Sequence, residues 1–232
     1  EQFKDQPAID AQLRQVLADR YESLGLYDAS LPLQTRALET RRRVLGEEHP
    51  NTILSIHKMG SLLVSLGRYA EAEPYYREAL DKSRRVKGQE HPHTLIAIND
   101  LGFLFQTQGK FAEAEPYYRE SLERSRHVLG EEHRDTLSFI NNIGGLFDAQ
   151  GRFAEAEPYY REALEKSRSV LGEEHPDTIA SINNMGSLLY SMGNASKAEP
   201  YYRESVEKSR RVLGPEHQHT LIYISHLSGL LR

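Results

Sequence analysis

Cysteine is absent from this 232-residue chain, and so are long apolar runs. Without cysteine the chain can form neither a disulfide framework nor a thiolate zinc site, and cysteine usage says nothing of its compartment. No apolar run approaches the roughly 20 residues of a membrane-spanning helix. The N-terminal string EQFKDQPAID also lacks the basic and then apolar order of a signal peptide. We therefore expect a soluble, cytoplasmic protein without a membrane partner.

An excess of positive charge is missing as well. The chain has 29 Lys and Arg against 34 Asp and Glu, a formal net charge of −5, and the two signs are interspersed. A nucleic-acid backbone or an anionic lipid surface needs a broad basic face, so neither is an expected partner. Phosphate loops, serine nucleophile elbows and the HExxH pattern are also absent. We predict no enzyme activity and no cofactor.

A period of 42 residues organises what is present, and such a period must be settled before any local interpretation. It is carried by the glycines at 25, 67, 109, 151 and 193, by those at 46, 88, 130, 172 and 214, and by Pro32, Pro74, Pro116, Pro158 and Pro200. We predict one solenoid domain over 1–232. Its parts are an atypical repeat 1 at 8–49, repeats 2 to 5 at 50–91, 92–133, 134–175 and 176–217, and a partial sixth repeat or capping helix at 218–232.

Each copy reads as two helices. In the second copy, apolar residues recur at spacings of three and four, which predicts a helix over 50–66 that Gly67 ends. A second helix is predicted over 69–87, with acidic residues in its first turn and arginines in its last, as the helix dipole favours. One such pair cannot cover its own apolar face, so neighbouring copies must stack. The predicted fold class is an all-α solenoid of antiparallel helix pairs.

The repeated strings resemble a known family. MGSLLVSLGRYAEAEPYYREAL (59–80), IGGLFDAQGRFAEAEPYYREAL (143–164) and MGSLLYSMGNASKAEPYYRESV (185–206) resemble the tetratricopeptide repeat. The 42-residue period and the linker VLGEEHPDT (170–178) are similar to the kinesin light chain subclass. The resemblance implies a right-handed superhelix whose concave groove, lined by the first helices, binds a protein or peptide.

Both ends of the array differ from its middle. In the first copy, Pro7 stands where later copies have histidine, and Leu33 and Gln34 replace a pair of tyrosines. Terminal repeats are often atypical because one of their faces meets water. The chain stops at Arg232, three residues before the next expected turn glycine. We expect either a fragment of a longer array or a helix that caps the fifth copy.

One histidine recurs in every linker, at His49, His91, His133, His175 and His217. Equivalent helices of adjacent copies should lie about 8–10 Å apart, whereas zinc needs ligand nitrogens about 2.0–2.1 Å from one ion. One histidine per copy cannot converge on a metal. We predict that these residues cap and pack the helices.

The face of the first helices opposite the apolar stripe is the predicted ligand surface. Its candidate peptide-binding residues are His57, Lys58, Asn99, Asp100, Phe103, Gln106, Asn141, Asn142, Asp148, Asn183, Asn184 and Tyr190, with His226 as a further basic residue. An asparagine amide has donors and an acceptor that suit a peptide backbone, and the family resemblance implies that asparagines here face cargo. The alternative is that the asparagines link adjacent helices of the array.

The residues that vary along this face would set selectivity: basic Lys58, acidic Asp100 and Asp148, and aromatic Phe103 and Tyr190. This face lacks a dense cluster of lysine and arginine that would clamp a ligand's C-terminal carboxylate, so that class of ligand is disfavoured. Two further functions stay open at this point. The array could be a regulatory or self-assembly module of a larger protein, with self-association through its ends, or an engineered array without a natural ligand.

Overall fold

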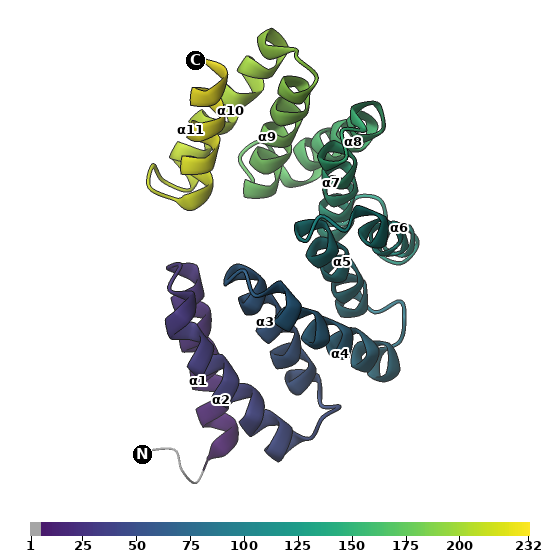
Figure 1. The fold of residues 1–232 in the computed structure, drawn as a ribbon, viewed down its shortest axis with the longest axis vertical. Helices are drawn as coiled ribbons and strands as arrows, with labels where there is room; N and C mark the ends of the chain where they lie inside the picture. Colours follow the sequence, from purple (N-terminus) through teal and green to yellow (C-terminus); the bar gives the residue numbers. More distant parts are fainter. Residues whose placement is uncertain (1–5) are drawn as a thin grey trace. The chain divides into compact units, whose positions relative to one another are not determined.

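The computed structural model describes residues 6–232, which form eleven α-helices and no strand (Figure 1). The helices are α1 (Pro7–Ser23), α2 (Tyr27–Leu45), α3 (Pro50–Ser65), α4 (Tyr69–Lys87), α5 (Pro92–Thr107), α6 (Phe111–Val128), α7 (Arg134–Ala149), α8 (Phe153–Leu171), α9 (Pro176–Ser191), α10 (Ala195–Val212) and α11 (Gln218–Leu230). The predicted all-α fold class is confirmed. Residues 1–5 of the predicted domain lie outside the described residues.

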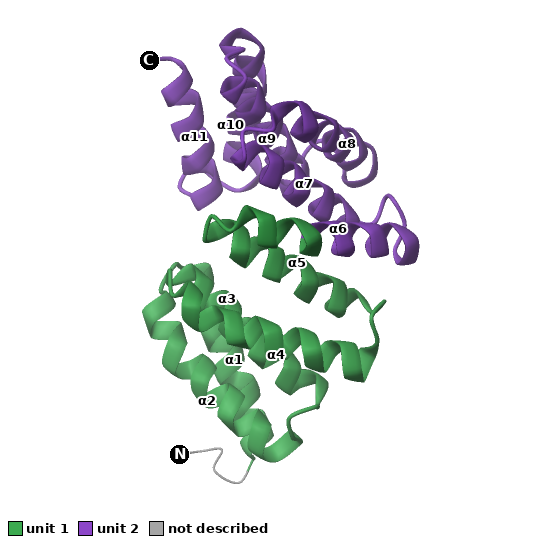
Figure 2. Cartoon of the chain, turned by 45° about the vertical axis from the view of Figure 1, so that its right-hand side comes forward, with its two compact units in different colours: residues 1–117 green, residues 118–232 purple. Residues whose placement is uncertain are grey.

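The chain divides into two compact units, which meet within α6 (Figure 2). Unit 1 ends at Tyr117 and unit 2 begins at Tyr118. In unit 1, α1 packs on α2, α2 on α3, α3 on α4 and α4 on α5. In unit 2 the same succession runs from α7 to α11, and α9 also contacts the first helices on either side of it, α7 and α11. From α1 to α5 in unit 1 and from α7 to α11 in unit 2, each helix thus packs on the one before it.

The repeated histidines begin the first helices. His49 is the N-cap of α3 in an extended conformation, and its Nδ1 accepts a hydrogen bond from the backbone N–H of Asn51 at 3.1 Å. The same bond recurs in all five linkers, from residues 93, 135, 177 and 219 to His91, His133, His175 and His217. Each bond satisfies a backbone donor that a helix start leaves unpaired. The predicted capping role is confirmed.

The repeated glycines do two different jobs. Gly67 follows the first helix of the second copy with φ +73°, a left-handed backbone conformation that residues other than glycine rarely adopt. Within α3, a Cβ added to Gly60 would lie 2.8 Å from the Tyr76 ring, so this position requires glycine for the two helices to approach. The structure places α3 over Pro50–Ser65, close to the predicted 50–66, and α4 over the predicted 69–87.

The core of each unit lies between the paired helices. Ile56 and Leu62 of α3 are fully buried, and Ile140 and Leu146 take the same places in α7 of unit 2. Full burial of one such side chain stabilises the fold by about 1.5–3 kcal/mol. The 42-residue pattern therefore places equivalent apolar contacts in both units.

Clusters of four charged residues, here called ion quartets, tie the linkers to the second helices. Arg42 of α2 pairs with Glu78 of α4 at 2.8 Å and with Glu47 of the linker at 3.4 Å, and Lys82 pairs with Glu47 at 2.9 Å. The equivalent quartets in unit 2 are Arg126, Glu131, Glu162, Lys166 and Arg168, Glu173, Glu204, Lys208. Arg42 is therefore engaged within the array.

Candidate functional site

Each unit has a first-helix face that carries predicted ligand residues, formed by α1, α3 and α5 in unit 1 and by α7, α9 and α11 in unit 2. In unit 1 its charged side chains pair between neighbouring helices. His57 Nε2 of α3 lies 2.5 Å from Asp100 Oδ2 of α5, and Lys58 Nζ donates to Asp19 Oδ1 of α1 at 2.5 Å. The structure thus pairs His57 with Asp100, both predicted, and pairs Lys58 with Asp19, which the sequence did not single out.

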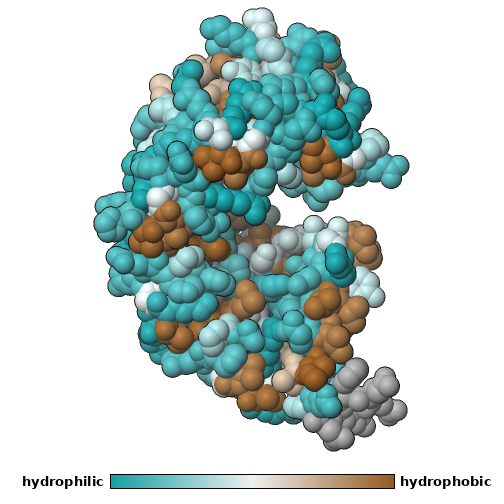
Figure 3. Space-filling view, turned by 180° about the vertical axis from the view of Figure 1, so that it is seen from behind, coloured by the Kyte–Doolittle hydropathy of each residue, from teal (hydrophilic) through white to brown (hydrophobic). Residues whose placement is uncertain are grey.

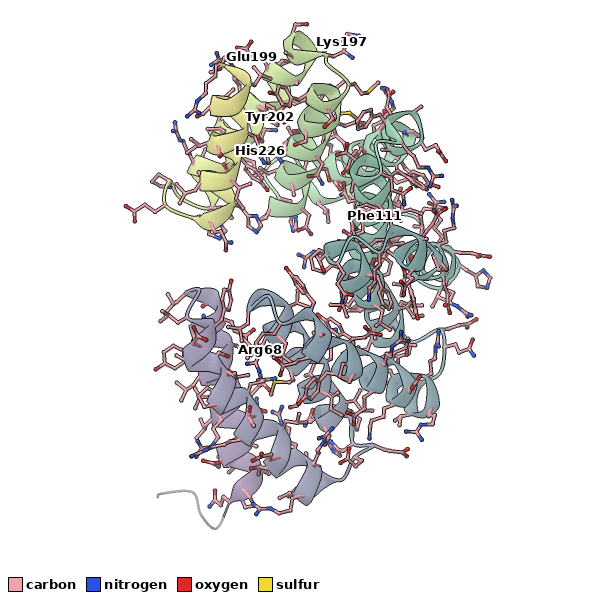
Figure 4. All side chains as sticks on the ribbon, viewed as in Figure 1. Arg68, Phe111, Lys197, Glu199, Tyr202 and His226 are labelled. Atoms are coloured by element: carbon pink, nitrogen blue, oxygen red, sulfur yellow. The ribbon has the colours of Figure 1, made fainter. Side chains whose placement is uncertain are left out.

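In unit 2 the asparagines form the corresponding links. Asn141 Nδ2 of α7 donates to Ser181 Oγ of α9 at 2.7 Å, and Asn184 Nδ2 of α9 donates to Asn141 Oδ1 at 3.4 Å. One helix further, His226 Nδ1 of α11 lies 3.0 Å from Asn183 Oδ1. Figure 4 shows His226 beside Tyr202 of α10, whose ring centroid is 5.7 Å away. These side chains connect three successive first helices.

The links share one register. His57–Asp100, Asn141–Asn184 and Asn183–His226 each join a residue to the residue 43 positions later, on the next first helix. We call this set the 43-residue ladder. It supports the alternative role predicted for the asparagines, which is to link adjacent helices of the array.

Two asparagines are more buried than the sequence predicted. Opposite the apolar stripe we expected solvent-facing side chains, but Asn99 and Asn183 are only 5% and 4% exposed. In unit 2 the reason is visible in the packing, since α7 and α11 contact α9 on both sides and cover its flanks. A helical-wheel argument treats one helix alone and omits this cover.

The aromatic residues of the face behave differently. Phe103 is 43% exposed and Tyr190 is 48% exposed, although both lie on first helices that are otherwise well packed. Gln106 lies on the same helix as Phe103 and is half-buried. Asp148 and Asn142 of α7 are also half-buried, and burial raises the pKa of the Asp148 carboxyl. The face therefore combines exposed rings with partly desolvated polar groups.

A cavity of about 160 Å³ lies between α3, α4 and α5 of unit 1. Its walls are mostly apolar and include Ile53, Leu54, Ile96 and Ala97, and its polar lining includes Lys87 at the end of α4. His57 is the candidate residue that also lines it. The sequence offered one signal for this site that was not used, because Lys87 stands where the other copies have leucine.

A buried polar cluster in the first copy was also missed. Arg41 is 4% exposed, and its Nη1 donates to Gln15 Oε1 at 3.0 Å and to Ser55 Oγ at 2.5 Å. Gln15 in turn donates to Gln34 Oε1 at 2.6 Å. Gln34 occupies the place of a tyrosine in later copies, so the atypical first copy replaces an aromatic contact with hydrogen bonds.

The described part of the chain has neither a cluster of metal ligands nor a helix that could span a membrane. Nowhere in residues 6–232 do three histidine, aspartate or glutamate side chains gather as metal ligands would. None of the helices in this part of the chain is both long and apolar enough to cross a membrane.

Comparison with known proteins identifies the family. The model of the tetratricopeptide repeat matches at residues 11–85, 52–127, 93–169 and 135–208, most of the chain. The protein therefore belongs to the tetratricopeptide repeat family. No curated protein matches the chain.

Solved structures show the same fold at low sequence identity. The nearly identical TPR-like repeats described as those of a kinesin light chain from Podosopora anserina match with a TM-score of 0.69 at 20% identity, over 88% of this chain and 97% of that one. BtubC from P. vanneervenii matches with a TM-score of 0.71 at 23% identity, over 88% and 82%. A Rap protein complexed with competence and sporulation factor matches with a TM-score of 0.63 at 12% identity, over 99% and 66%. The chain thus shares the fold of these repeats. Tetratricopeptide repeat proteins are generally non-catalytic scaffolds for protein interaction.

Proposed function

We propose that the first-helix face of each unit binds an extended segment of a partner protein, so that the chain works as an adaptor. The observation that carries this proposal is the exposure of Phe103 and Tyr190. Packing does not require these rings. Among copies two to five, the three other copies have serine or glycine at the place of Phe103. At the place of Tyr190 the other copies have valine, glutamine or aspartate. Exposed aromatic side chains are enriched among the residues that dominate binding energy.

The surrounding polar groups fit a peptide ligand. Asn141 uses one of its amide N–H groups on Ser181, and an asparagine amide has two such donors. A peptide strand advances about 3.3 Å per residue, and adjacent first helices are about 8–10 Å apart. One copy would then contact about three ligand residues, with the rings binding side chains and the amides binding backbone. The Rap protein whose structure matches was solved in complex with competence and sporulation factor, which is consistent with ligand binding by this fold.

The test is a selection of displayed random peptides on the purified chain, followed by affinity measurement on the variants Phe103→Ala and Tyr190→Ala. Loss of a ring that anchors the ligand should weaken binding by about 5- to 30-fold. Val86→Ala and Val170→Ala are matched controls, because both side chains are exposed apolar residues on second helices. Failure to select any peptide, or equal sensitivity of the control variants, would overturn the proposal.

A second candidate function is self-assembly through the first helix. Leu13, Val16 and Leu17 of α1 are 43%, 47% and 53% exposed, and brown apolar atoms gather at this end of unit 1 in Figure 3. In the second copy the places of Leu13 and Leu17 are held by Ser55 and Met59, which are buried. A stripe on one helix can pair with its own copy in a two-fold symmetric dimer. Sedimentation of the chain beside a Leu13→Gln, Leu17→Gln variant tests this, since a monomer in both would exclude it.

A further inference from the structure

The cavity between α3, α4 and α5 differs chemically from the same place in other copies. Ala97 forms one wall, whereas Phe139 holds that position in the fourth copy and Tyr223 in the sixth, both buried. Where the position is serine, a neighbouring polar side chain occupies the space. Ser55 accepts from Arg41, and Ser181 accepts from Asn141. Ala97 has a small side chain and no hydroxyl to accept such a bond, which leaves the space open.

The rim of this cavity is more positive than its equivalents. Lys87 replaces the leucine found at 45, 129, 171 and 213, and His93 replaces the aspartate found at 135 and 177. Two residues after Lys87, Gln89 replaces the glutamate of three other linkers. The structure records no ion pair for Lys87 within the described residues, and burial lowers the pKa of its ammonium group. The partly buried ammonium group of Lys87, which has no carboxylate partner among the described residues, therefore borders a mostly apolar cavity.

The size of the cavity limits its occupant. Sites for drug-sized ligands usually measure about 300–1,000 Å³, well above the 160 Å³ here. An apolar cavity of about 150 Å³ can hold a group the size of benzene. One aliphatic or phenyl side chain fits this volume, and Ile53, Leu54 and Ile96 supply the apolar contacts for it.

We propose that this cavity anchors one aliphatic side chain of a bound peptide and that Lys87 binds a carboxylate beside that side chain. The inference rests on the proposed function, because it makes copies two and three the place where an adaptor selects its ligand. Charge-assisted hydrogen bonds are roughly twice as strong as neutral ones, so Lys87 would favour an acid over its amide. The carboxylate is that of an aspartate or glutamate side chain, because the face lacks the lysine and arginine cluster that would clamp a C-terminus.

The probes that test it are fluorescent eight-residue peptides with randomised flanks. One set carries an internal Leu-Glu pair, a second carries Leu-Gln, and a third carries Ser-Glu. A fourth ends in leucine with either a free or an amidated C-terminus. Polarisation assays should show about tenfold tighter binding of Leu-Glu than of either other internal pair. A preference for free over amidated ends, without one for Leu-Glu over Leu-Gln, would overturn the assignment of the carboxylate to a side chain.

Two variants then test the two halves of the site. Lys87→Leu restores the leucine of the other copies and should abolish the acid preference, while Lys197→Leu removes an exposed lysine of unit 2, marked in Figure 4, and should leave it unchanged. Ala97→Phe introduces the residue of the fourth copy and should weaken binding of all leucine peptides at least tenfold. If Ala97→Phe lowers the melting temperature strongly, Lys87→Leu decides by itself.

The outcomes separate this inference from the proposed function. Peptides that bind with no acid preference, or with a preference that Lys87→Leu leaves intact, overturn the inference alone. Binding of leucine peptides that survives in a well-folded Ala97→Phe variant does the same. If no peptide of any set binds, both the adaptor function and the anchor site fall.

Discussion

Replacing Asn141 and Asn183 by alanine tests whether the 43-residue ladder holds the first helices of unit 2 together. The change removes the bond from Asn141 to Ser181, the bond from Asn184 to Asn141 and the contact between Asn183 and His226. Each intramolecular hydrogen bond contributes about 0.5–1.5 kcal/mol, and a buried partner left unpaired costs about 1–3 kcal/mol. Since Asn183 is 4% exposed, we expect the double variant to lose about 2–4 kcal/mol of unfolding free energy.

The assay is thermal unfolding followed by circular dichroism, beside peptide affinity once a ligand is selected. For a chain of this length, 1 kcal/mol shifts the melting temperature by about 2–4 °C, so a fall of about 5–15 °C is expected. From the sequence alone, with both side chains facing solvent, we would predict almost no shift. The control is Ser191→Ala, an exposed position of α9 that should change stability by less than about 0.5 kcal/mol. An unchanged melting temperature together with a tenfold loss of affinity would refute the linking role and assign these asparagines to the ligand.

Three other predictions follow from the packing and the helix ends. Gly60→Ala should lower the free energy of unfolding in urea by about 1–3 kcal/mol, because the added Cβ would lie 2.8 Å from a tyrosine ring. Gly229→Ala, whose Cβ would have nothing within 4 Å, should be neutral or slightly stabilising. Equal effects of the two substitutions would contradict the close approach of the helices. Burial lowers the pKa of His226, so its neutral form is favoured in the folded state, and stability should decline as pH falls below the ordinary value of about 6.5 and through the folded-state pKa. That decline should be weaker in His226→Asn when melting is followed from about pH 8 to 5, and a wild-type protein that gains stability on acidification would show the opposite sign. His133→Ala should cost about 0.5–2 kcal/mol through loss of the N-cap, whereas His127→Ala, an exposed side chain in the last turn of α6, should leave the urea midpoint unchanged.

The fold was predictable because the 42-residue period repeats every turn signal five times. Gly67 and the apolar spacing before it placed the end of α3 within one residue, and the limits of α4 were predicted correctly. The capping role of the linker histidines also followed from sequence, since one residue per copy has no route to a shared metal. These features depend on residues close together along the chain, which a sequence shows directly.

The surface was harder to predict because it depends on side chains of other helices that are distant along the chain. Asn183 looked exposed on an isolated helix, but α7 and α11 cover its flanks. Arg41 is one of three consecutive arginines near the end of α2, yet it is buried in a cluster that forms only when α1, α2 and α3 pack. The cavity beside Ala97 exists because the side chains of α3, α4 and α5 leave space between these helices. Comparing copies position by position could have flagged Lys87, whose leucine counterparts recur in every other linker.

The ladder also restricts how an array of this kind can diverge. The repeat has 42 residues and the pairs are 43 residues apart, so each pair joins two different positions of successive copies. A residue and its partner therefore belong to different copies. His57 faces Asp100, whereas Asn141 faces Asn184. A substitution at one member changes the environment of the residue 43 positions away, and a newly duplicated copy must match its hydrogen-bond partners in the copies before and after it. We expect homologous arrays to show correlated changes at this spacing, with charged pairs and amide pairs exchanged as units.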